Sequence, residues 1–428
     1  MAPWRPRWPL VAVLVGAVAV GCTGSPAAPR PGASTKPGTR ASKAAGTPGP
    51  ATSGGASSTP GKPAGTPGPI GPTGTASPRG TPGPSAGPVG PAASATPRPT
   101  PTPRPTPTLG PDGGRTLAGT LEVGVVDGPW DLARFQGPEG LAVGADGVVY
   151  VADTAAGMLR KVDAKGETAP VAGGSGVGLK DGIALSGGPN TGGATLQGPI
   201  GLAVAPDGAV LVADTGNHAV RRVKDGKVTT LAGTGQPGWL DGEGKQAQLS
   251  GPQGLAVAAD GTIYVADTGN HRLRVISPAG IVSTLAGASE AALVDGEASG
   301  AAFSEPVALV LEASGSLLVL DRGNKAIRRV TLGGLVSTLA GGVQTVQVDG
   351  VGTAAGFRSP SAFALEPSGA LLVSDLVPPA LRRVTPDGQV TTLKAGPEAI
   401  AIAVTGSRCY VILLNEPRVR VYDLPLKP

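Results

Sequence analysis

The chain has 428 residues, of which 35 are Lys or Arg and 30 are Asp or Glu. Ten of the basic residues and none of the acidic ones precede Asp112, which leaves 25 basic against 30 acidic residues in the remainder. That balance argues against a nucleic-acid-binding domain, which normally presents a basic face. With 2 cysteines and 2 histidines, the sequence also argues against a disulfide framework and a histidine-held zinc site.

Residues 1–22 have the pattern of an export signal. Two arginines precede an apolar run from Pro9 to Val20, which is shorter than the roughly 20 residues of a membrane-spanning helix. The small residues that end on Cys22 resemble a bacterial lipobox, although Ala19 stands where leucine is usual. We therefore expect lipidation at Cys22 and an extracytoplasmic location in the cell envelope. The alternative is an ordinary signal peptide cut near Ala27 and a secreted protein.

Residues 23–111 are rich in Pro, Gly, Ser, Thr and Ala and contain no acidic residue. Few of them are large and apolar, so burial cannot offset the entropy of ordering this segment. The composition predicts a disordered linker between the export signal and a folded domain.

From Gly137 onward, a pattern of four short strands recurs six times. In the copy at 251–287 the strands read GLAV, TIYVA, RLRVI and IVSTLAG, separated by turn residues. The aspartates that end the second strands lie 61, 53, 54 and 54 residues apart, at Asp153, Asp214, Asp267, Asp321 and Asp375. Because a single unit cannot bury both faces of its sheet, the repeats predict an all-β, six-bladed β-propeller over residues 112–428.

The sixth copy lacks its fourth strand. Its predicted strands are Ala399–Ala403, Cys409–Leu413 and Val419–Tyr422, whereas residues 116–119 repeat the TLAG phrase that ends other copies. We expect this N-terminal segment to complete the last blade and remove an open sheet edge. The propeller should need nothing upstream of Asp112 and should be a monomer.

The phrase PxGLAVxxDGxxYVADTGNHxxRxV, followed by TLAG, resembles the NHL repeat. The resemblance is strongest in copies two and three and weakest in the last. It implies the propeller fold. Members of this group include ligand- and protein-binding modules as well as some lyases and lactonase-like enzymes.

An arginine follows each of the five aspartates by seven residues, a spacing that makes the two side chains diagonal neighbours on one hairpin face. The predicted pairs are Asp153–Arg160, Asp214–Arg221, Asp267–Arg274, Asp321–Arg328 and Asp375–Arg382. Arg420 holds the same place in the sixth copy, where Leu413 replaces the acid. Because the pairs recur around the ring, we interpret them as braces of the hairpins and not as catalytic groups.

No metal or other cofactor is predicted. His218 and His271 follow equivalent turns and lack a third histidine, so we interpret them as repeat-position residues. Asp-Gly phrases stand at Asp127, Asp181, Asp241, Asp295 and Asp349. Their carboxylate oxygens would suit a calcium ion, but Asp-Gly is also a common turn sequence.

The predicted function is a non-catalytic binding module whose partner is a protein, peptide or glycan. We place its contact surface on the segments that join consecutive repeats, and the candidate residues there are Trp130, Trp239, Asp241, Glu243, Asp295 and Glu297. An enzyme with its site at the mouth of the central channel is the alternative, and a structural spacer is a third. The acids that could converge at that mouth are Glu139, Glu305 and Glu398.

Overall fold

The computed structural model describes residues 107–110, 112–174, 176–184, 193–395 and 398–426. They lie within one compact unit, Pro97–Pro428. Strands dominate, and the remaining regular elements are the short 3-10 helices η1 (Thr154–Ala156), η2 (Thr215–Asn217), η3 (Thr268–Asn270), η4 (Ala298–Gly300) and η5 (Gly352–Ala354). Within these described ranges, no helix has the length and apolar character needed to span a membrane.

Five blades follow one another along the chain, each with four consecutive antiparallel strands. Blade 1 contains β2 (Pro138–Val143), β3 (Val149–Asp153), β4 (Met158–Val162) and β5 (Thr168–Gly173). Blade 2 contains β7 (Pro199–Val204), β8 (Val210–Asp214), β9 (Ala219–Lys224) and β10 (Lys227–Ala232). Blade 3 contains β12 (Leu255–Val257), β13 (Ile263–Asp267), β14 (Arg272–Ile276) and β15 (Ile281–Ala286). Blade 4 contains β17 (Pro306–Leu311), β18 (Leu317–Asp321), β19 (Ala326–Val330) and β20 (Leu335–Gly341). Blade 5 contains β22 (Pro360–Leu365), β23 (Leu371–Leu376), β24 (Pro379–Val384) and β25 (Gln389–Ala395).

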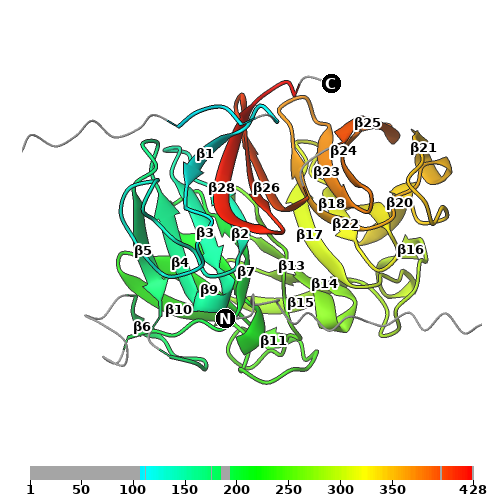
Figure 1. Ribbon diagram of the computed structural model, residues 1–428. Coiled ribbons are helices and arrows are strands. Elements are labelled where there is room, and N and C mark those ends of the chain that lie inside the picture. Colours follow the sequence, from blue (N-terminus) through cyan, green and yellow to red (C-terminus); the bar gives the residue numbers. More distant parts are fainter. Residues whose placement is uncertain (1–106, 111, 175, 185–192, 396–397, 427–428) are drawn as a thin grey trace, which may run out of the picture. The chain divides into compact units, whose positions relative to one another are not determined.

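Blade 6 is assembled from both ends of the described chain. It contains β26 (Ala399–Thr405), β27 (Arg408–Leu413) and β28 (Glu416–Asp423), and its outer strand is β1 (Arg115–Ala118). β1 pairs antiparallel with β28, with Arg115 opposite Val421, and Figure 1 shows the cyan β1 beside the red β28. The predicted six-bladed propeller and its closure by an N-terminal strand are both confirmed.

The structure adds a fifth, outermost strand to blades 2–5 that the repeat pattern did not predict. These two-residue strands are β6 (Gly182–Ile183), β11 (Gly242–Glu243), β16 (Gly296–Glu297) and β21 (Gly350–Val351), and they pair with β10, β15, β20 and β25. Each belongs to the segment that connects two blades. The connecting segments therefore run down the outer edge of the next blade and partly cover it.

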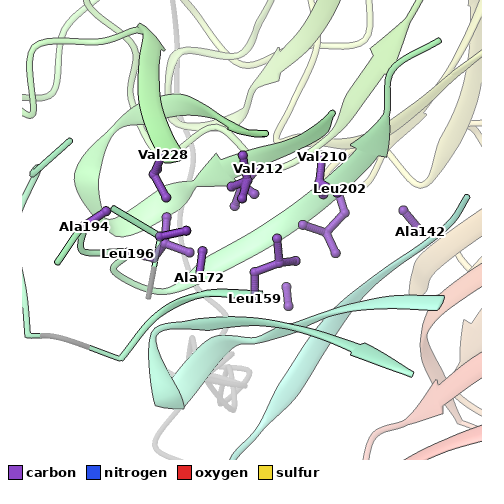
Figure 2. Packing of buried hydrophobic residues seen from close by; sticks show 12 residues of the cluster. Ala142, Leu159, Ala172, Ala194, Leu196, Leu202, Val210, Val212 and Val228 are labelled. Carbon is purple, nitrogen blue, oxygen red and sulfur yellow. The ribbon is translucent and has the colours of Figure 1, made fainter. Parts of the chain in front are cut away.

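The core lies between the faces of neighbouring blades. Between blades 1 and 2, Leu159 packs with Leu196, Val212 and Val228, and Figure 2 shows this cluster. Equivalent clusters fill the other blade interfaces, and one of them joins blade 6 to blade 1 through Val151 and its neighbours. Alternation along each strand sends side chains to both faces, so each blade is buried on two sides.

Neighbouring first strands approach one another closely around the ring. A Cβ atom on Gly140 would lie 1.7 Å from the carbonyl oxygen of Ile200, and one on Gly201 would lie 1.6 Å from that of Gln253. These glycines are therefore required by backbone contact between blades. Thr154 adds a hydrogen bond from its hydroxyl to the Pro199 carbonyl, at 2.7 Å.

Candidate functional site

All five predicted Asp–Arg pairs lie in contact, and all ten side chains are fully buried. The N···O distances are 3.2 Å for Asp153–Arg160, 2.6 Å for Asp214–Arg221, 2.7 Å for Asp267–Arg274, 2.7 Å for Asp321–Arg328 and 3.6 Å for Asp375–Arg382. Each aspartate also accepts a backbone N–H from the segment before the first strand, as Asp267 does from Ser250 at 2.7 Å. This bonding joins three parts of one blade.

A second aspartate, from the preceding connecting segment, reaches each of these arginines. The pairs are Asp127–Arg160, Asp181–Arg221, Asp241–Arg274, Asp295–Arg328 and Asp349–Arg382, at 2.6, 3.1, 2.5, 2.7 and 2.8 Å. Asp181, Asp241, Asp295 and Asp349 also accept from a threonine of the outer strand, as Asp295 does from the Thr338 N–H at 3.0 Å and hydroxyl at 2.9 Å. Asp241 and Asp295, which we predicted for the binding face, therefore have both carboxylate oxygens engaged in holding the blade together.

The two aspartates on Arg221 and the two on Arg328 have pKa values shifted in opposite directions: the pKa of the buried one is raised and that of the linker one is lowered. Burial raises the pKa of Asp153 to about 6, and it outweighs the lowering effect of Arg160 and of the Gln136 N–H. Burial likewise raises the pKa of Asp267. Partial burial also tends to raise the pKa of Asp295. The hydrogen bonds from Thr338 and Arg328 lower it by more, so the pKa of Asp295 lies below its usual value.

Blade 6 uses a different acid. Leu413 replaces the buried aspartate, and Arg420 pairs through Nη2 with Asp112 at 2.7 Å and through Nη1 with Glu416 at 3.8 Å. The Tyr422 hydroxyl donates to the same carboxylate at 2.6 Å. Upstream of it, Leu109 forms an isolated bridge with Arg115. Leu109 thus pairs with the first residue of β1, upstream of the predicted domain boundary.

The two histidines tie neighbouring blades together. His218 Nδ1 accepts the N–H of Gly251 at 3.0 Å, and His271 Nδ1 accepts that of Glu305 at 3.1 Å. Both residues have a positive φ, at 50° and 55°, where they end the turns after the second strands. Across the described residues, no three His, Cys, Asp or Glu side chains are grouped as metal ligands.

The three glutamates considered for the channel mouth do not form one group. Glu305 pairs with Arg322 at 3.1 Å, and Glu398 accepts from the Asn415 amide at 2.9 Å. Glu139, in β2, is half-buried, and its carboxylate makes no hydrogen bond or ion pair with any described residue. Burial raises the pKa of this isolated carboxyl to about 7.

We call the segments 119–137, 233–251, 287–305 and 341–359, together with the described residues 176–184 and 193–198, the blade linkers. Asparagines of the turns after the second strands hold three of them. Asn217 donates to the Gly178 carbonyl at 2.9 Å, Asn270 to Gly238 at 2.7 Å and Asn324 to Ala292 at 2.7 Å. Each asparagine also bonds the buried aspartate of its own blade at 2.8 Å. The linkers are thus fixed to the same network as the Asp–Arg pairs.

Of the predicted contact residues, Trp239 is the most exposed aromatic side chain, at 64%, and Arg272 lies 4.7 Å over its ring. Trp130 is half-buried. Glu243 is exposed but does not lie near Trp239. The N–H of the following residue, Gly244, donates to the Gly280 carbonyl in the turn between the third and fourth strands of blade 3. That turn is at the opposite end of the blade from the Asn270 turn.

Glu297 is placed like Glu243, because the N–H that follows it, of Ala298, donates to Gly334 at 2.9 Å in the corresponding turn of blade 4. The structure therefore separates these two glutamates from the end of the blades where Trp239 lies. The structure also shows a set of exposed aliphatic side chains in the first blade linker that the sequence did not indicate. They are Leu121, Val123, Val125, Val126 and Leu132. Their signal in the sequence is an apolar run outside any strand phrase.

Cys22 lies outside the described residues. Cys409 is buried in β27, and burial raises the pKa of its thiol to about 12. It has the packing role that its apolar neighbours suggest.

The NHL repeat is matched at residues 196–222 and 249–276. Protein SUPPRESSOR OF QUENCHING 1, chloroplastic, of Arabidopsis thaliana is 35% identical over 154 residues, which cover 33% of this chain and 14% of that protein. NHL repeat-containing protein 2 of Gallus gallus is 28% identical over 293 residues, covering 48% of this chain and 40% of that protein. Teneurin-3 of Danio rerio is 29% identical over 222 residues, covering 46% and 8%. The chain thus spans less than half the length of each of these relatives.

Two solved structures share the fold. A Bacteroides thetaiotaomicron protein of unknown function has a TM-score of 0.53 at 15% identity, covering 72% of this chain and 74% of its own. An auxiliary nutrient binding protein from the same organism has a TM-score of 0.52 at 14% identity, covering 72% and 75%. At such identities the likeness concerns the fold alone.

Proposed function

We propose that this NHL-repeat six-bladed propeller is a non-catalytic module that binds a protein, peptide or glycan through its blade linkers. The observation that carries the proposal is the combination of order and exposure in the linkers. Asparagine side chains hold linker carbonyls in place at Gly178, Gly238 and Ala292. The same segments expose large apolar side chains such as Trp239 and Leu240. Rigid, exposed aromatic and aliphatic groups are the usual anchors of an interface.

The distribution of the acids supports this function over catalysis. Five buried and five linker aspartates are bonded to arginines that brace the blades. Groups that are repeated and fully engaged suit a scaffold, whereas catalytic acids need free lone pairs at a single site.

The test compares variants of two exposed apolar side chains at opposite ends of the blades. Trp239→Ala removes a side chain that is 64% exposed on a linker, and Leu335→Ala removes one that is 49% exposed beside the opposite turns. Photo-crosslinking of the full chain in its native envelope, followed by binding measurements with the purified partner, should show at least tenfold weaker binding for Trp239→Ala. Leu335→Ala should bind as the wild type does. Equal binding by the wild type and both variants would show that Trp239 does not contribute to the interface.

We also propose that lipid on Cys22 anchors the protein extracytoplasmically in the cell envelope. The support is the apolar run and the small residues that end on this cysteine. Labelling with a fatty acid should mark the wild type and not Cys22→Ser. An unlabelled wild type with a mature N-terminus at another residue would contradict anchoring and leave secretion as the outcome.

One observation favours the lactonase- or lyase-like alternative: Glu139. Its carboxyl has no partner among the described residues, and burial raises its pKa to about 7, a suitable value for a general acid or base. Incubation with a panel of sugar lactones distinguishes the two functions. The binding module should show no turnover above background, whereas turnover that Glu139→Gln abolishes would establish the enzyme.

A further inference from the structure

One residue of each blade lies at the mouth of the central channel. In blades 1–5 it follows the proline at the entry to the first strand, and in blade 6 it follows Ala399. We call these residues the channel mouth: Glu139, Ile200, Gln253, Val307, Ser361 and Ile400. All but Val307 are partly exposed, although each follows a buried residue. First strands lie at the inner edge of their sheets and contact one another around the ring, so this exposure is to the channel.

The channel mouth alternates in polarity around the ring. Blades 1, 3 and 5 contribute the polar side chains Glu139, Gln253 and Ser361, whereas blades 2, 4 and 6 contribute only Ile or Val. Neighbouring first strands are close at this level, because a Cβ atom on Gly201 would lie 1.6 Å from the Gln253 carbonyl oxygen. Apolar walls with a few convergent polar groups are typical of a small, specific binding site.

Each of the three polar groups can accept a hydrogen bond. The Glu139 carboxylate and the Gln253 side-chain amide make no hydrogen bond within the described chain. The Ser361 hydroxyl donates to the Ala399 carbonyl at 2.8 Å, so lone pairs of its oxygen are available to a further donor. The channel mouth therefore offers three acceptors from alternate blades.

Glu139 supplies the only charge among these six residues. Burial raises its pKa to about 7, and no neighbouring described charge contributes to that shift. A divalent metal ion fits this setting poorly, because Ca²⁺ takes about 6–8 oxygen ligands, several of them carboxylates. Across the described residues, no three His, Cys, Asp or Glu side chains are grouped as such ligands. A single carboxylate among neutral groups is complementary to a single positive charge.

We propose that the channel mouth binds the side-chain ammonium of a lysine from the protein or peptide partner. This group has one charge and three N–H donors, which match one carboxylate and three acceptors on alternate blades. Its aliphatic stem would pack against the Ile and Val side chains between them. The planar fork of an arginine, with five donors, matches such a threefold set less well.

This inference rests on the proposed binding function and names the group that the partner inserts. The channel mouth follows directly on the blade linkers, since Glu139 lies two residues after the segment 119–137 and Gln253 two residues after 233–251. A partner that contacts the linkers can therefore reach into the channel with one long side chain.

The experiment selects 12-residue linear peptides from a displayed random library on the full chain, with counter-selection on Glu139→Gln. The selected peptides should share a lysine. Its replacement by norleucine or Nε-acetyl-lysine should weaken binding of a fluorescent synthetic peptide by about tenfold or more, and Glu139→Gln should do the same. The lysine and norleucine peptides should bind Glu139→Gln equally, because the two changes remove the same contact.

Glu398→Gln is the matched control. It removes a negative charge from the same end of the neighbouring blade, where Glu398 bonds Asn415 at 2.9 Å, and it should bind as the wild type does. Gln253→Leu removes the second acceptor and should weaken binding of the lysine peptide about threefold to tenfold. Because the Glu139 carboxylate has no partner in the described chain, Glu139→Gln should unfold at or above the wild-type temperature.

The chain's own linker contains Lys36, Lys43 and Lys62, which are a second source of ammonium groups. Replacing the three together with glutamine in the full chain should leave peptide binding unchanged. Tighter binding by that variant would show that the chain occupies its own channel mouth, and it would overturn the proposal.

Three further results would also overturn it. The first is a library that yields no peptide dependent on both its lysine and Glu139. The second is a stoichiometrically bound metal ion that Glu139→Gln loses. The third is a lower unfolding temperature for Glu139→Gln, which would give Glu139 a structural role. Partner binding that depends on Trp239 but not on Glu139 would leave the proposed function standing and refute this inference alone.

Discussion

Each buried arginine lies between two aspartates whose environments differ. Arg274 bonds Asp267, which is fully buried, and Asp241, which is about half exposed. Burying one charge alone would be unfavourable, but the arginine also donates to the carbonyls of Gln248 and Leu240, so most of its donors are engaged. The arrangement fixes the hairpin, the first-strand entry and the linker relative to one another.

Replacing Asp267 with alanine should therefore destabilise the protein by about 3–5 kcal/mol. The lower value is expected, because Arg274 still pairs with Asp241. Urea unfolding of Asp267→Ala, Arg274→Ala and the double variant measures the coupling between them. Ser283→Ala is the control, because Ser283 is exposed in β15 of the same blade; it should change stability by no more than about 0.5 kcal/mol. A coupling energy near zero would show that the pair does not brace the hairpin.

The titration of Asp153 gives a pH dependence with a definite sign. Its folded-state pKa of about 6 lies above the ordinary 3.8, so between those values the folded chain holds the proton more tightly than the unfolded chain. The stability that this gives is complete below about pH 4 and is lost as the pH rises to about 6.

The stability of the wild type relative to Asp153→Asn should therefore fall by up to about 3 kcal/mol from pH 4 to pH 6 and then stay level. Chemical unfolding of both proteins across this range is the measurement. A relative stability that rises with pH would mean that Arg160, at 3.2 Å, dominates over burial.

Among the elements, the blade linkers are organised by the turns after the second strands. Asn270 bonds the Gly238 carbonyl at 2.7 Å and Asp267 at 2.8 Å, so one side chain joins η3 to a linker and to the buried pair. The linker then continues into β11 on the outer edge of blade 3. Display of Trp239 thus depends on contacts made by a different element.

Asn270→Ala should loosen this linker without unfolding the blade. Loss of the two hydrogen bonds should cost about 1–2 kcal/mol and speed hydrogen exchange in residues 234–241 about tenfold. Asn415→Ala, at an exposed amide that bonds Glu398, is the control and should leave the linker unchanged. Unaltered exchange in Asn270→Ala would contradict the role given to the turn asparagines.

Sequence periodicity predicted the elements that repeat and missed those that do not. A seven-residue spacing places Asp267 and Arg274 on one hairpin, so their contact follows from local geometry. β11 could not be predicted in this way, because a two-residue strand has no period. Glu243 was placed on the wrong end of the blade for the same reason: its position depends on pairing with Ile281, 38 residues away in the chain.

The whole ring is closed by contacts between residues about 300 positions apart. β1 completes blade 6, and Asp112 supplies the acid that the sixth repeat lacks, bonding Arg420 and Tyr422. The TLAG phrase made the strand predictable. The role of Asp112 was not, since it belongs to no repeat phrase and its partners lie 308 and 310 residues away.

Thermal unfolding of two shortened chains tests ring closure most directly. A chain that begins at Pro97 keeps Asp112 and β1, and it should unfold within about 1 °C of the full chain. A chain that begins at Thr120 loses both. Removing Asp112 leaves the largely buried Arg420 with Glu416 at 3.8 Å as its acidic partner, so the loss should be up to about 3–5 kcal/mol and should lower the midpoint by up to about 10 °C. The opened edge should cause concentration-dependent association. Equal midpoints for the two chains, with both monomeric at every concentration, would contradict closure by the N-terminal segment.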